Sequence, residues 1–231
     1  MNTYNVEVAL SSALEPYIHY FSNNTHKFIA AIGEHLLLSG AALLVASALG
    51  IVLGVLCAYN KTVNVVATGV FSVARIVPSL AILFLCLPLM GTGMKPSVAA
   101  LTFLALPPIL INTAVALASI PAAALEAARG MGMNVPQIFF RIKAPLALPL
   151  FMAGFKTAAV EVIASATLAA YIGGGGLGVI IFTGLGLMRT ELLLIGGASV
   201  ALLSLLVDFS LALLEKRVHV TLFGGAIRHR L

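Results

Sequence analysis

Long apolar runs separated by short polar connections dominate the chain. The hydrocarbon layer of a bilayer is roughly 30 Å thick and a helix rises about 1.5 Å per residue, so a spanning helix needs about 20 mainly apolar residues. Five windows meet this length, approximately Leu36 to Tyr59, Val66 to Met90, Ser97 to Ser119, Leu146 to Tyr171 and Glu191 to Leu214. The stretch from Leu177 to Met188 is too short and glycine-rich to cross alone, which indicates a re-entrant or interfacial piece. The pattern predicts an all-α integral membrane protein with about five transmembrane helices.

Composition excludes a soluble globule. Of the 231 residues, 61% are hydrophobic and only 9% are charged, and the mean hydropathy is +1.10. An ordinary soluble domain is about a quarter charged, so too few charges are present here to cover a water-exposed surface. The two cysteines, Cys57 and Cys86, both lie in apolar runs and indicate neither a disulfide framework nor a metal site.

Positive charge collects beside particular windows, and this bias sets the expected orientation. Acidic residues outnumber basic ones before the first window, whereas basic residues predominate after the third window and in the C-terminal tail. The basic residues of these segments are Arg129, Arg141, Lys143, Lys216, Arg217, Arg228 and Arg230. We therefore expect the N-terminus outside and the C-terminus in the cytoplasm, and we attribute the net charge of +5 to topology rather than to nucleic-acid binding.

This orientation divides the chain into three parts. Residues 1–35 form an extracytoplasmic N-terminal segment, whose aromatic side chains suit an interfacial helix, although a poorly ordered tail fits as well. Residues 36–217 form one membrane domain, with its longest cytoplasmic connection at 121–145. Residues 218–231 form a basic cytoplasmic tail.

The cytoplasmic connection from Pro121 to Pro145 carries the most specific pattern. Its first part, around Glu126, is rich in Ala and Leu and favours a helix. Gly130, Gly132 and Pro136 then interrupt the helical pattern before an apolar run leads back to the next window. The pattern predicts a helix, a glycine turn and a second short helix, which together form a compact knob suited to docking.

Fixed spacing within this knob resembles the EAA loop of the permease subunits of binding-protein-dependent ABC importers. The matching positions are Glu126, Ala127, Ala128, Gly132, Ile142 and Pro145. In that family the loop lies in a cleft of the cytoplasmic ATPase and passes its closure to the spans. Chemically, the carboxylate suits a charged or hydrogen-bonded contact, the alanines allow close helix approach, and the glycine permits a tight turn. Ala144 stands where the family usually has Leu, from which we expect a small loss of packing; the alternative for the whole segment is an ordinary interfacial helix-turn-helix.

Further stretches resemble the osmoprotectant branch of this family, which imports glycine betaine, choline, carnitine and similar compounds. These stretches are Ile76 to Ala81, Met94 to Pro96, Glu126 to Met133 and Ala166 to Gly178. The resemblance covers roughly Leu36 to Arg217 and implies the five-helix core of a type I ABC importer permease in a bacterial cytoplasmic (inner) membrane. It also implies an identical or homologous second permease, two ATPase subunits and an extracytoplasmic substrate-binding protein. On this expectation the chain is not an enzyme and binds no cofactor, and ATP and Mg are held by the partner ATPase.

Several glycine patterns imitate other motifs. The chain has no G-x-x-x-x-G-K-[ST] sequence, so it lacks the usual phosphate loop for ATP. Gly173, Gly175 and Gly178 match the dinucleotide fingerprint by spacing, but they follow a predicted membrane helix rather than a strand, which favours a flexible turn. Gly50 and Gly54 form a G-x-x-x-G pattern that is either a close helix contact or a chance match.

Four charged residues fall within the windows, and each costs about 2.5 to 3.5 kcal/mol at mid-bilayer without a partner or water. At about 1.5 Å per residue, Arg75, Lys156 and Asp208 share a layer in the inner half, whereas Glu161 lies in the outer half. We expect Asp208 to pair with Arg75 or Lys156 as a structural bridge. Glu161 has no evident partner there. It either faces a hydrated translocation path, where it favours a quaternary-ammonium headgroup, or is a neutral, hydrogen-bonded residue between helices.

A second class of function stays open at this point. An ion-coupled secondary transporter would use Glu161 and Asp208 as proton sites. An enzyme lacks support, because no nucleophile, base and orienting group can be assembled and hence no catalytic residue is expected. The five histidines are scattered along the chain and predict no metal site.

Overall fold

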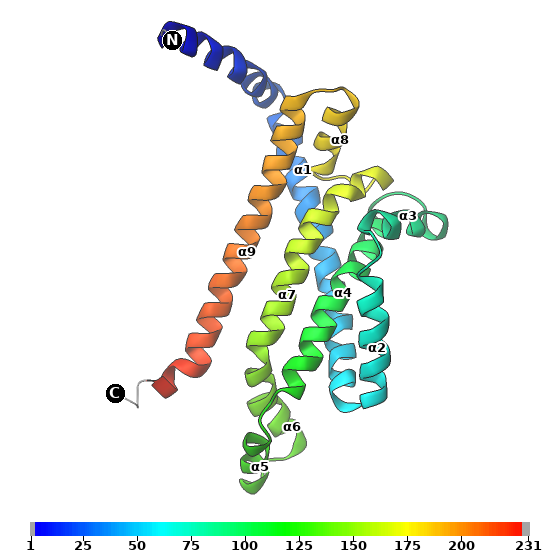
Figure 1. Ribbon diagram of the computed structural model, residues 1–231, viewed down its shortest axis with the longest axis vertical. Coiled ribbons are helices and arrows are strands. Elements are labelled where there is room, and N and C mark those ends of the chain that lie inside the picture. Colours follow the sequence, from blue (N-terminus) through cyan, green and yellow to red (C-terminus); the bar gives the residue numbers. More distant parts are fainter. Residues whose placement is uncertain (1–2, 228–231) are drawn as a thin grey trace.

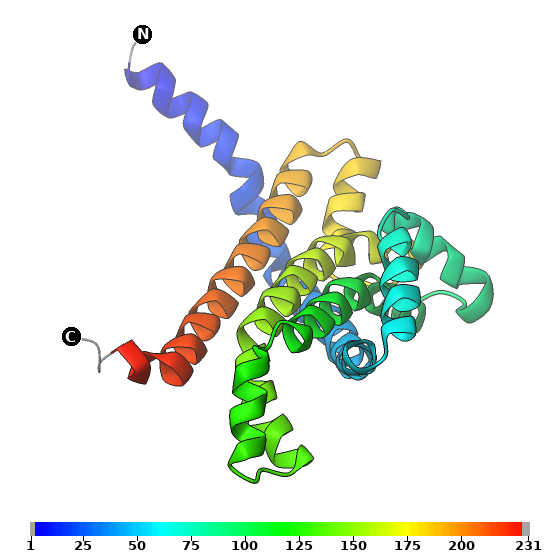
Figure 2. The same ribbon diagram turned by 60° about the horizontal axis from the view of Figure 1, so that its bottom comes forward.

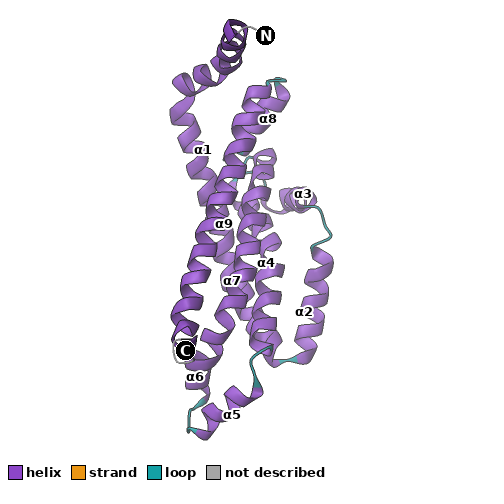
Figure 3. Ribbon diagram, turned by 60° about the vertical axis from the view of Figure 1, so that its left-hand side comes forward, coloured by secondary structure: helices purple, strands orange, loops and turns teal. Residues whose placement is uncertain are grey.

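In the computed structural model, residues 3–227 are described, and within this range every element is a helix (Figures 1 and 3). The four long helices are α1 (Thr3–Tyr59), α4 (Met94–Ala118), α7 (Ala144–Ala166) and α9 (Thr190–Ile227). The shorter helices are α2 (Lys61–Ala74), α3 (Ser79–Met90), α5 (Ala122–Gly130), α6 (Val135–Ile138) and α8 (Gly178–Gly186). A π-helical stretch η1 (Phe139–Lys143) and a 3-10 stretch η2 (Thr167–Ile172) extend the two ends of α7. Arg228 and Arg230 of the predicted basic tail lie outside the described residues.

Within residues 3–227, four helical segments are long and apolar enough to cross a membrane, and a bent pair of helices supplies a fifth. The prediction of one straight span from Val66 to Met90 is wrong, because α2 and α3 meet at an angle of 100°. Pro78 causes the break: it has no N–H to donate, and its ring disfavours the helical conformation of Val77 before it. The Val77 N–H instead closes a tight turn on the carbonyl of Ala74, at 3.2 Å.

Helix α1 begins far earlier than the predicted first window, which started at Leu36. The polar residues upstream leave the helix unbroken, and some of their side chains bond back to its own carbonyls. Asn23 Nδ2 donates to the His19 carbonyl at 3.0 Å, and Asn24 Nδ2 donates to that of Tyr20 at 3.3 Å. The helix therefore runs without interruption from the N-terminal segment into the membrane domain, and its N-terminal part leans away from the bundle (Figure 1).

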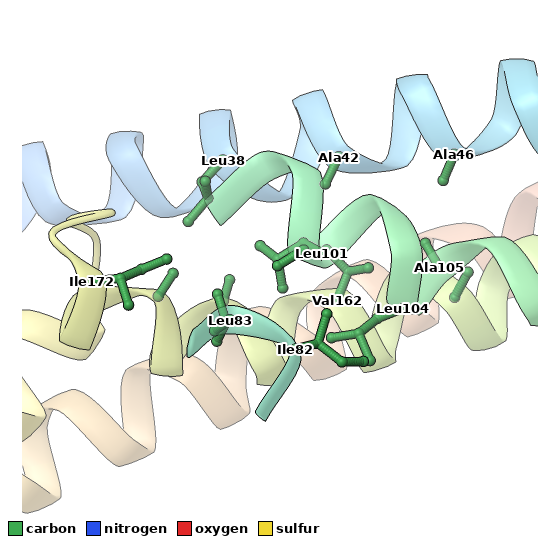
Figure 4. Packing of buried hydrophobic residues seen from close by; sticks show 14 of the residues in the cluster. Leu38, Ala42, Ala46, Ile82, Leu83, Leu101, Leu104, Ala105, Val162 and Ile172 are labelled. Atoms are coloured by element: carbon green, nitrogen blue, oxygen red, sulfur yellow. The ribbon is translucent and has the colours of Figure 1, made fainter. Parts of the chain in front are cut away.

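Helix α4 is the centre of the bundle and packs between α1 and α7. Its buried face joins a core to which α1, α3, α7 and η2 also contribute (Figure 4). Lipid tails are as apolar as leucine, so close van der Waals packing rather than the hydrophobic effect holds such helices together. The labelled core residues are Leu38, Ala42, Ala46, Ile82, Leu83, Leu101, Leu104, Ala105, Val162 and Ile172.

Glycines set the close approach of the helices on both sides of α4. A Cβ added to Gly50 would lie 2.7 Å from Ile109 Cγ2, and one added to Gly54 would lie 2.5 Å from Thr113 Cβ. The G-x-x-x-G pattern of α1 is therefore a helix contact and not a chance match. On the other side, a Cβ on Gly154 of α7 would come within 2.5 Å of an α4 side-chain atom.

The two ends of the bundle differ. The α5 and α6 knob and the end of α9 lie at one end, whereas α8 and the start of α1 lie at the other (Figures 1 and 2). The short apolar stretch from Leu177 to Met188 forms α8, which has nine residues and packs against α9 and η2 without crossing. The knob is thus separated from the glycine turn before α8 by the length of the bundle.

Candidate coupling loop and intramembrane charges

Helix α5 presents the acidic position of the loop to solvent. Glu126 and Ala127 are exposed, whereas Ala128 on the opposite side is fully buried. Within the described part of the chain, the Glu126 carboxylate has no hydrogen-bond or ion-pair partner, so its acceptor capacity is free for another molecule. A buried alanine at this point allows the helix to lie close to the returning segment, which contacts α5 through α6 and η1.

Gly132 terminates α5 in a defined way. Its φ is +74°, a left-handed conformation that side-chain-bearing residues adopt only with strain. The Gly132 N–H donates to the Arg129 carbonyl at 2.9 Å, and the Met133 N–H donates to the Ala128 carbonyl at 3.2 Å. These two bonds form a Schellman motif, which satisfies the last carbonyls of the helix. The glycine of the loop pattern therefore fixes the turn by its backbone.

The returning segment begins with a capping box that sequence reasoning missed. Asn134 Oδ1 accepts the Gln137 N–H at 3.0 Å, and Gln137 Oε1 accepts the Asn134 N–H at 2.9 Å. An Asn followed three residues later by Gln was the available signal. Ile142 and Pro145 follow in half-buried positions, where the chain passes through the π-helical η1 into α7. Pro145 has no N–H to donate, which is compatible with this local departure from α-helical bonding.

Large apolar side chains are exposed on the knob beside Glu126 and the basic residues Arg129 and Arg141. Met131, Val135 and Phe140 are 70%, 77% and 72% exposed. At the base of the loop, Lys143 Nζ donates to the Tyr59 hydroxyl at 3.0 Å and lies 4.5 Å from the centre of that ring. This contact ties the returning segment to the end of α1, and the knob therefore combines a fixed base with a surface on which apolar side chains lie beside the carboxylate of Glu126 and the exposed Arg129 and Arg141.

One intramembrane charge pair joins α7 to α9. Lys156 Nζ lies 3.2 Å from Asp208 Oδ1, which is one of the two pairings that the sequence left open for Asp208. The contact lies within hydrogen-bonding distance, and it reduces the cost of keeping both charges in the hydrocarbon layer.

The second pair departs from expectation. Arg75 does not lie in the layer of Lys156 and Asp208, and Glu161 is not without a partner, because the Arg75 Nη2 and Glu161 Oε2 atoms are 3.9 Å apart. The depth estimate for Arg75 assumed a straight second span. The bend at Pro78 instead leaves Arg75 directly after the end of α2, beside the half of α7 that leads into η2.

Two further polar contacts, which the sequence did not predict, link α1 to the other end of the bundle. The Gly176 N–H donates to Glu34 Oε2 at 2.9 Å. His35 Nε2 lies 3.0 Å from the Ile163 carbonyl, near the point where α7 tightens into η2. The glycine turn is thus held by α1. No strand precedes it anywhere in residues 3–227, which rules out a dinucleotide-binding unit there.

With this geometry in place, comparison with known proteins defines the class of the chain. Residues 50–220 match the family described as the inner membrane component of binding-protein-dependent transport systems. The chain belongs to this family and is a multi-pass protein of the bacterial inner membrane. The ion-coupled alternative receives no support from this assignment.

Individual relatives narrow the assignment. The chain is 39% identical over 205 residues to the carnitine transport permease OpuCB of Listeria monocytogenes, covering 89% of this chain and 94% of that protein. It is 35% identical to the glycine betaine/carnitine/choline permease OpuCB of Bacillus subtilis, covering 86% and 92%. It is 34% identical to the osmoprotectant import permease OsmW of Salmonella typhimurium, covering 91% and 99%. The predicted resemblance to osmoprotectant permeases is confirmed.

Solved structures confirm the predicted fold. An inward-facing structure of the MetNI methionine ABC transporter matches with a TM-score of 0.71 at 22% identity, covering 83% of this chain and 95% of that one. An amino acid ABC transporter solved with histidines matches with a TM-score of 0.68 at 20% identity, covering 85% and 96%. The five-helix fold of type I importer permeases is therefore shared despite low identity.

Proposed function

We propose that this chain is the permease of an ATP-driven importer for an osmoprotectant or a related quaternary amine. The names of its relatives support the substrate class, since they include permeases for carnitine, glycine betaine and choline. The observation that carries the proposal is the knob, which projects from one end of the bundle (Figure 2) and exposes the Glu126 carboxylate on helix α5, just before the turn closed by Gly132. The partners are two cytoplasmic ATPases, a second permease and an extracytoplasmic binding protein.

The knob would transmit the closure of the ATPases to the membrane helices. Val135–Ile172 forms one helical run through α6, η1, α7 and η2, so displacement at the docking end is passed along the run. Helix α7 carries Lys156 and Glu161, and α5 follows α4 after a short turn at Ser119 and Ile120. A docked ATPase could in this way move both the central helix and the helix that bears the intramembrane charges.

ATP chemistry belongs to the partner in this proposal. ATP and Mg would bind the ATPase, whose docking requires the knob to face the cytoplasm and the N-terminus to lie outside. Positive charge at Arg129, Arg141 and Lys143 supports this orientation.

The two charge pairs take different roles. Lys156 and Asp208, in direct contact between α7 and α9, serve as a structural bridge. Glu161 lines the translocation path, where a carboxylate favours the passage of quaternary-ammonium groups. Glu161→Gln should slow uptake without lowering the amount of permease in the membrane, and unchanged uptake would remove this residue from the path.

The coupling role is tested by Glu126→Lys. We expect the variant to insert normally but to lose substrate-stimulated ATP hydrolysis and to retain less ATPase on purification. Glu215→Lys is the matched control, because it makes the same charge change on α9, outside the knob. Normal uptake by Glu126→Lys, or an equal loss in both variants, would contradict docking through Glu126.

A further inference from the structure

The Arg75 and Glu161 pair is longer than the Lys156 and Asp208 pair, 3.9 Å against 3.2 Å, although the two pairs are exposed to a similar extent. At 3.9 Å the two side chains attract each other across a distance too long for a hydrogen bond. Glu161 Oε2 is shielded from solvent and has no hydrogen-bond partner in the described part of the chain. The side chains as a whole remain 44% and 34% exposed, so a third group can reach both of them.

The two members of this pair are held by different structural elements. Arg75 follows α2 at the bend before α3, and Glu161 belongs to α7. Helix α3 packs against α4 and η2, and its Ile82 and Leu83 belong to the same buried cluster as Val162 of α7 (Figure 4). The spacing of the two charges is therefore set by packed helices.

The membrane environment restricts what can cover these charges. A charged side chain facing lipid costs about 2.5 to 3.5 kcal/mol at mid-bilayer, so the exposed parts of Arg75 and Glu161 must face water, substrate or protein. The pair is neutral as a whole. A cation that entered between the two residues would add a net charge to this region, whereas a zwitterion would add none.

We infer that Arg75 and Glu161 together form a transient binding place for a zwitterionic quaternary amine. The carboxylate of the substrate accepts two parallel hydrogen bonds from the Arg75 guanidinium, and its trimethylammonium group lies beside the Glu161 carboxylate. The substrate thus replaces one long ion pair with two shorter ones. This inference rests on the proposed function. It adds that Arg75 distinguishes zwitterions such as glycine betaine from simple cations such as choline. A simple cation has no carboxylate for Arg75 to bind, and it competes with Arg75 for the Glu161 carboxylate.

Two substitutions of Arg75 test the inference in the complete transport complex. Arg75→Gln removes the charge, and Arg75→Lys keeps the charge but loses the planar fork that binds a carboxylate through two bonds. We expect the ratio of glycine betaine uptake to choline uptake to fall about tenfold in both variants, because a charge-assisted hydrogen bond is lost. Lys156→Gln is the control, because it removes a basic partner from the other charge pair on α7, the helix that carries Glu161, and it should lower abundance or thermal stability without changing the ratio.

Glycine betaine uptake by Arg75→Lys alone also shows whether Arg75 binds the substrate or only forms a structural ion pair, because the variant keeps the charge that pairs with Glu161. A loss of about tenfold at normal abundance supports substrate contact through the fork. Wild-type uptake by Arg75→Lys, or a ratio unchanged in both variants, would overturn the inference and leave a structural ion pair. If the wild-type complex imports none of glycine betaine, carnitine and choline with ATP, the proposed function fails; if it imports glycine betaine and Arg75→Lys does so equally, only the inference fails.

Discussion

Two glycines of the knob offer a controlled test of how its turn is stabilised. Gly130 is the last residue of α5 and has an ordinary helical conformation, whereas Gly132 has a φ of +74°. A Cβ added at either position meets no atom within 4 Å. Substitution by Ala at these sites therefore changes the conformational energy of the backbone without a steric clash. We expect Gly132→Ala to destabilise the turn and Gly130→Ala to stabilise helix α5.

For Gly132→Ala, the left-handed conformation costs about 1 to 2 kcal/mol. Each 1.4 kcal/mol changes an equilibrium constant by a factor of ten, so the equilibrium constant for opening the turn should rise about 5- to 30-fold. For Gly130→Ala, the lower entropy of the unfolded chain and the better helix propensity should stabilise α5 by about 0.5 to 1 kcal/mol.

Hydrogen exchange at the amide of residue 133 reports this opening, because that N–H donates to the Ala128 carbonyl only when the turn is closed. We expect faster exchange in Gly132→Ala, unchanged or slower exchange in Gly130→Ala, and a matching loss of ATPase coupling only in the former. Equal exchange rates in the two variants would refute the argument that the φ of Gly132 controls the turn.

Three further substitutions test other parts of the structure. Gly54→Leu forces a side chain against Thr113 and should lower the thermal stability of the purified permease by an amount equivalent to about 1 to 3 kcal/mol; an unchanged melting temperature would contradict the close packing of α1 on α4. Lys156→Met should destabilise the permease by up to about 2.5 to 3.5 kcal/mol because it leaves Asp208 unpaired among apolar helices, whereas adding Asp208→Leu should restore much of the loss; a double variant worse than the single one would argue against pairing. Asn134→Ala removes the capping box and should cost about 0.5 to 2 kcal/mol, measured as faster amide exchange at residue 137.

Much of the fold could be predicted because membrane helices are marked by long apolar runs and the coupling loop by fixed spacing. The broken second span could not. Pro107, Pro108 and Pro149 lie inside α4 and α7 without ending them, so Pro78 carries no signal that separates it from a tolerated proline. Apolar character is also similar on both sides of the break, which hides it from any count of hydrophobic positions.

The incorrect prediction of a straight span through Pro78 also led to incorrect ion-pair predictions for two intramembrane charges, Arg75 and Glu161. The prediction left Glu161 without a partner because it assigned Arg75 a depth by counting residues along a straight helix. The pairing of Lys156 with Asp208, in contrast, lies between two unbroken helices, where counting residues from the membrane boundary gives a usable depth. The polar links of Glu34 and His35 to distant backbone groups depend on tertiary packing and leave no local pattern in the sequence.

The account depends most on the knob lying in the cytoplasm against the ATPase. A single cysteine in place of Met131, which is 70% exposed, tests this once Cys57 and Cys86 have been replaced. We predict that a membrane-impermeant thiol reagent modifies this cysteine in inverted vesicles but not in intact cells, and that a short cross-linker joins it to the ATPase. Modification from the outside of intact cells would contradict the central claim.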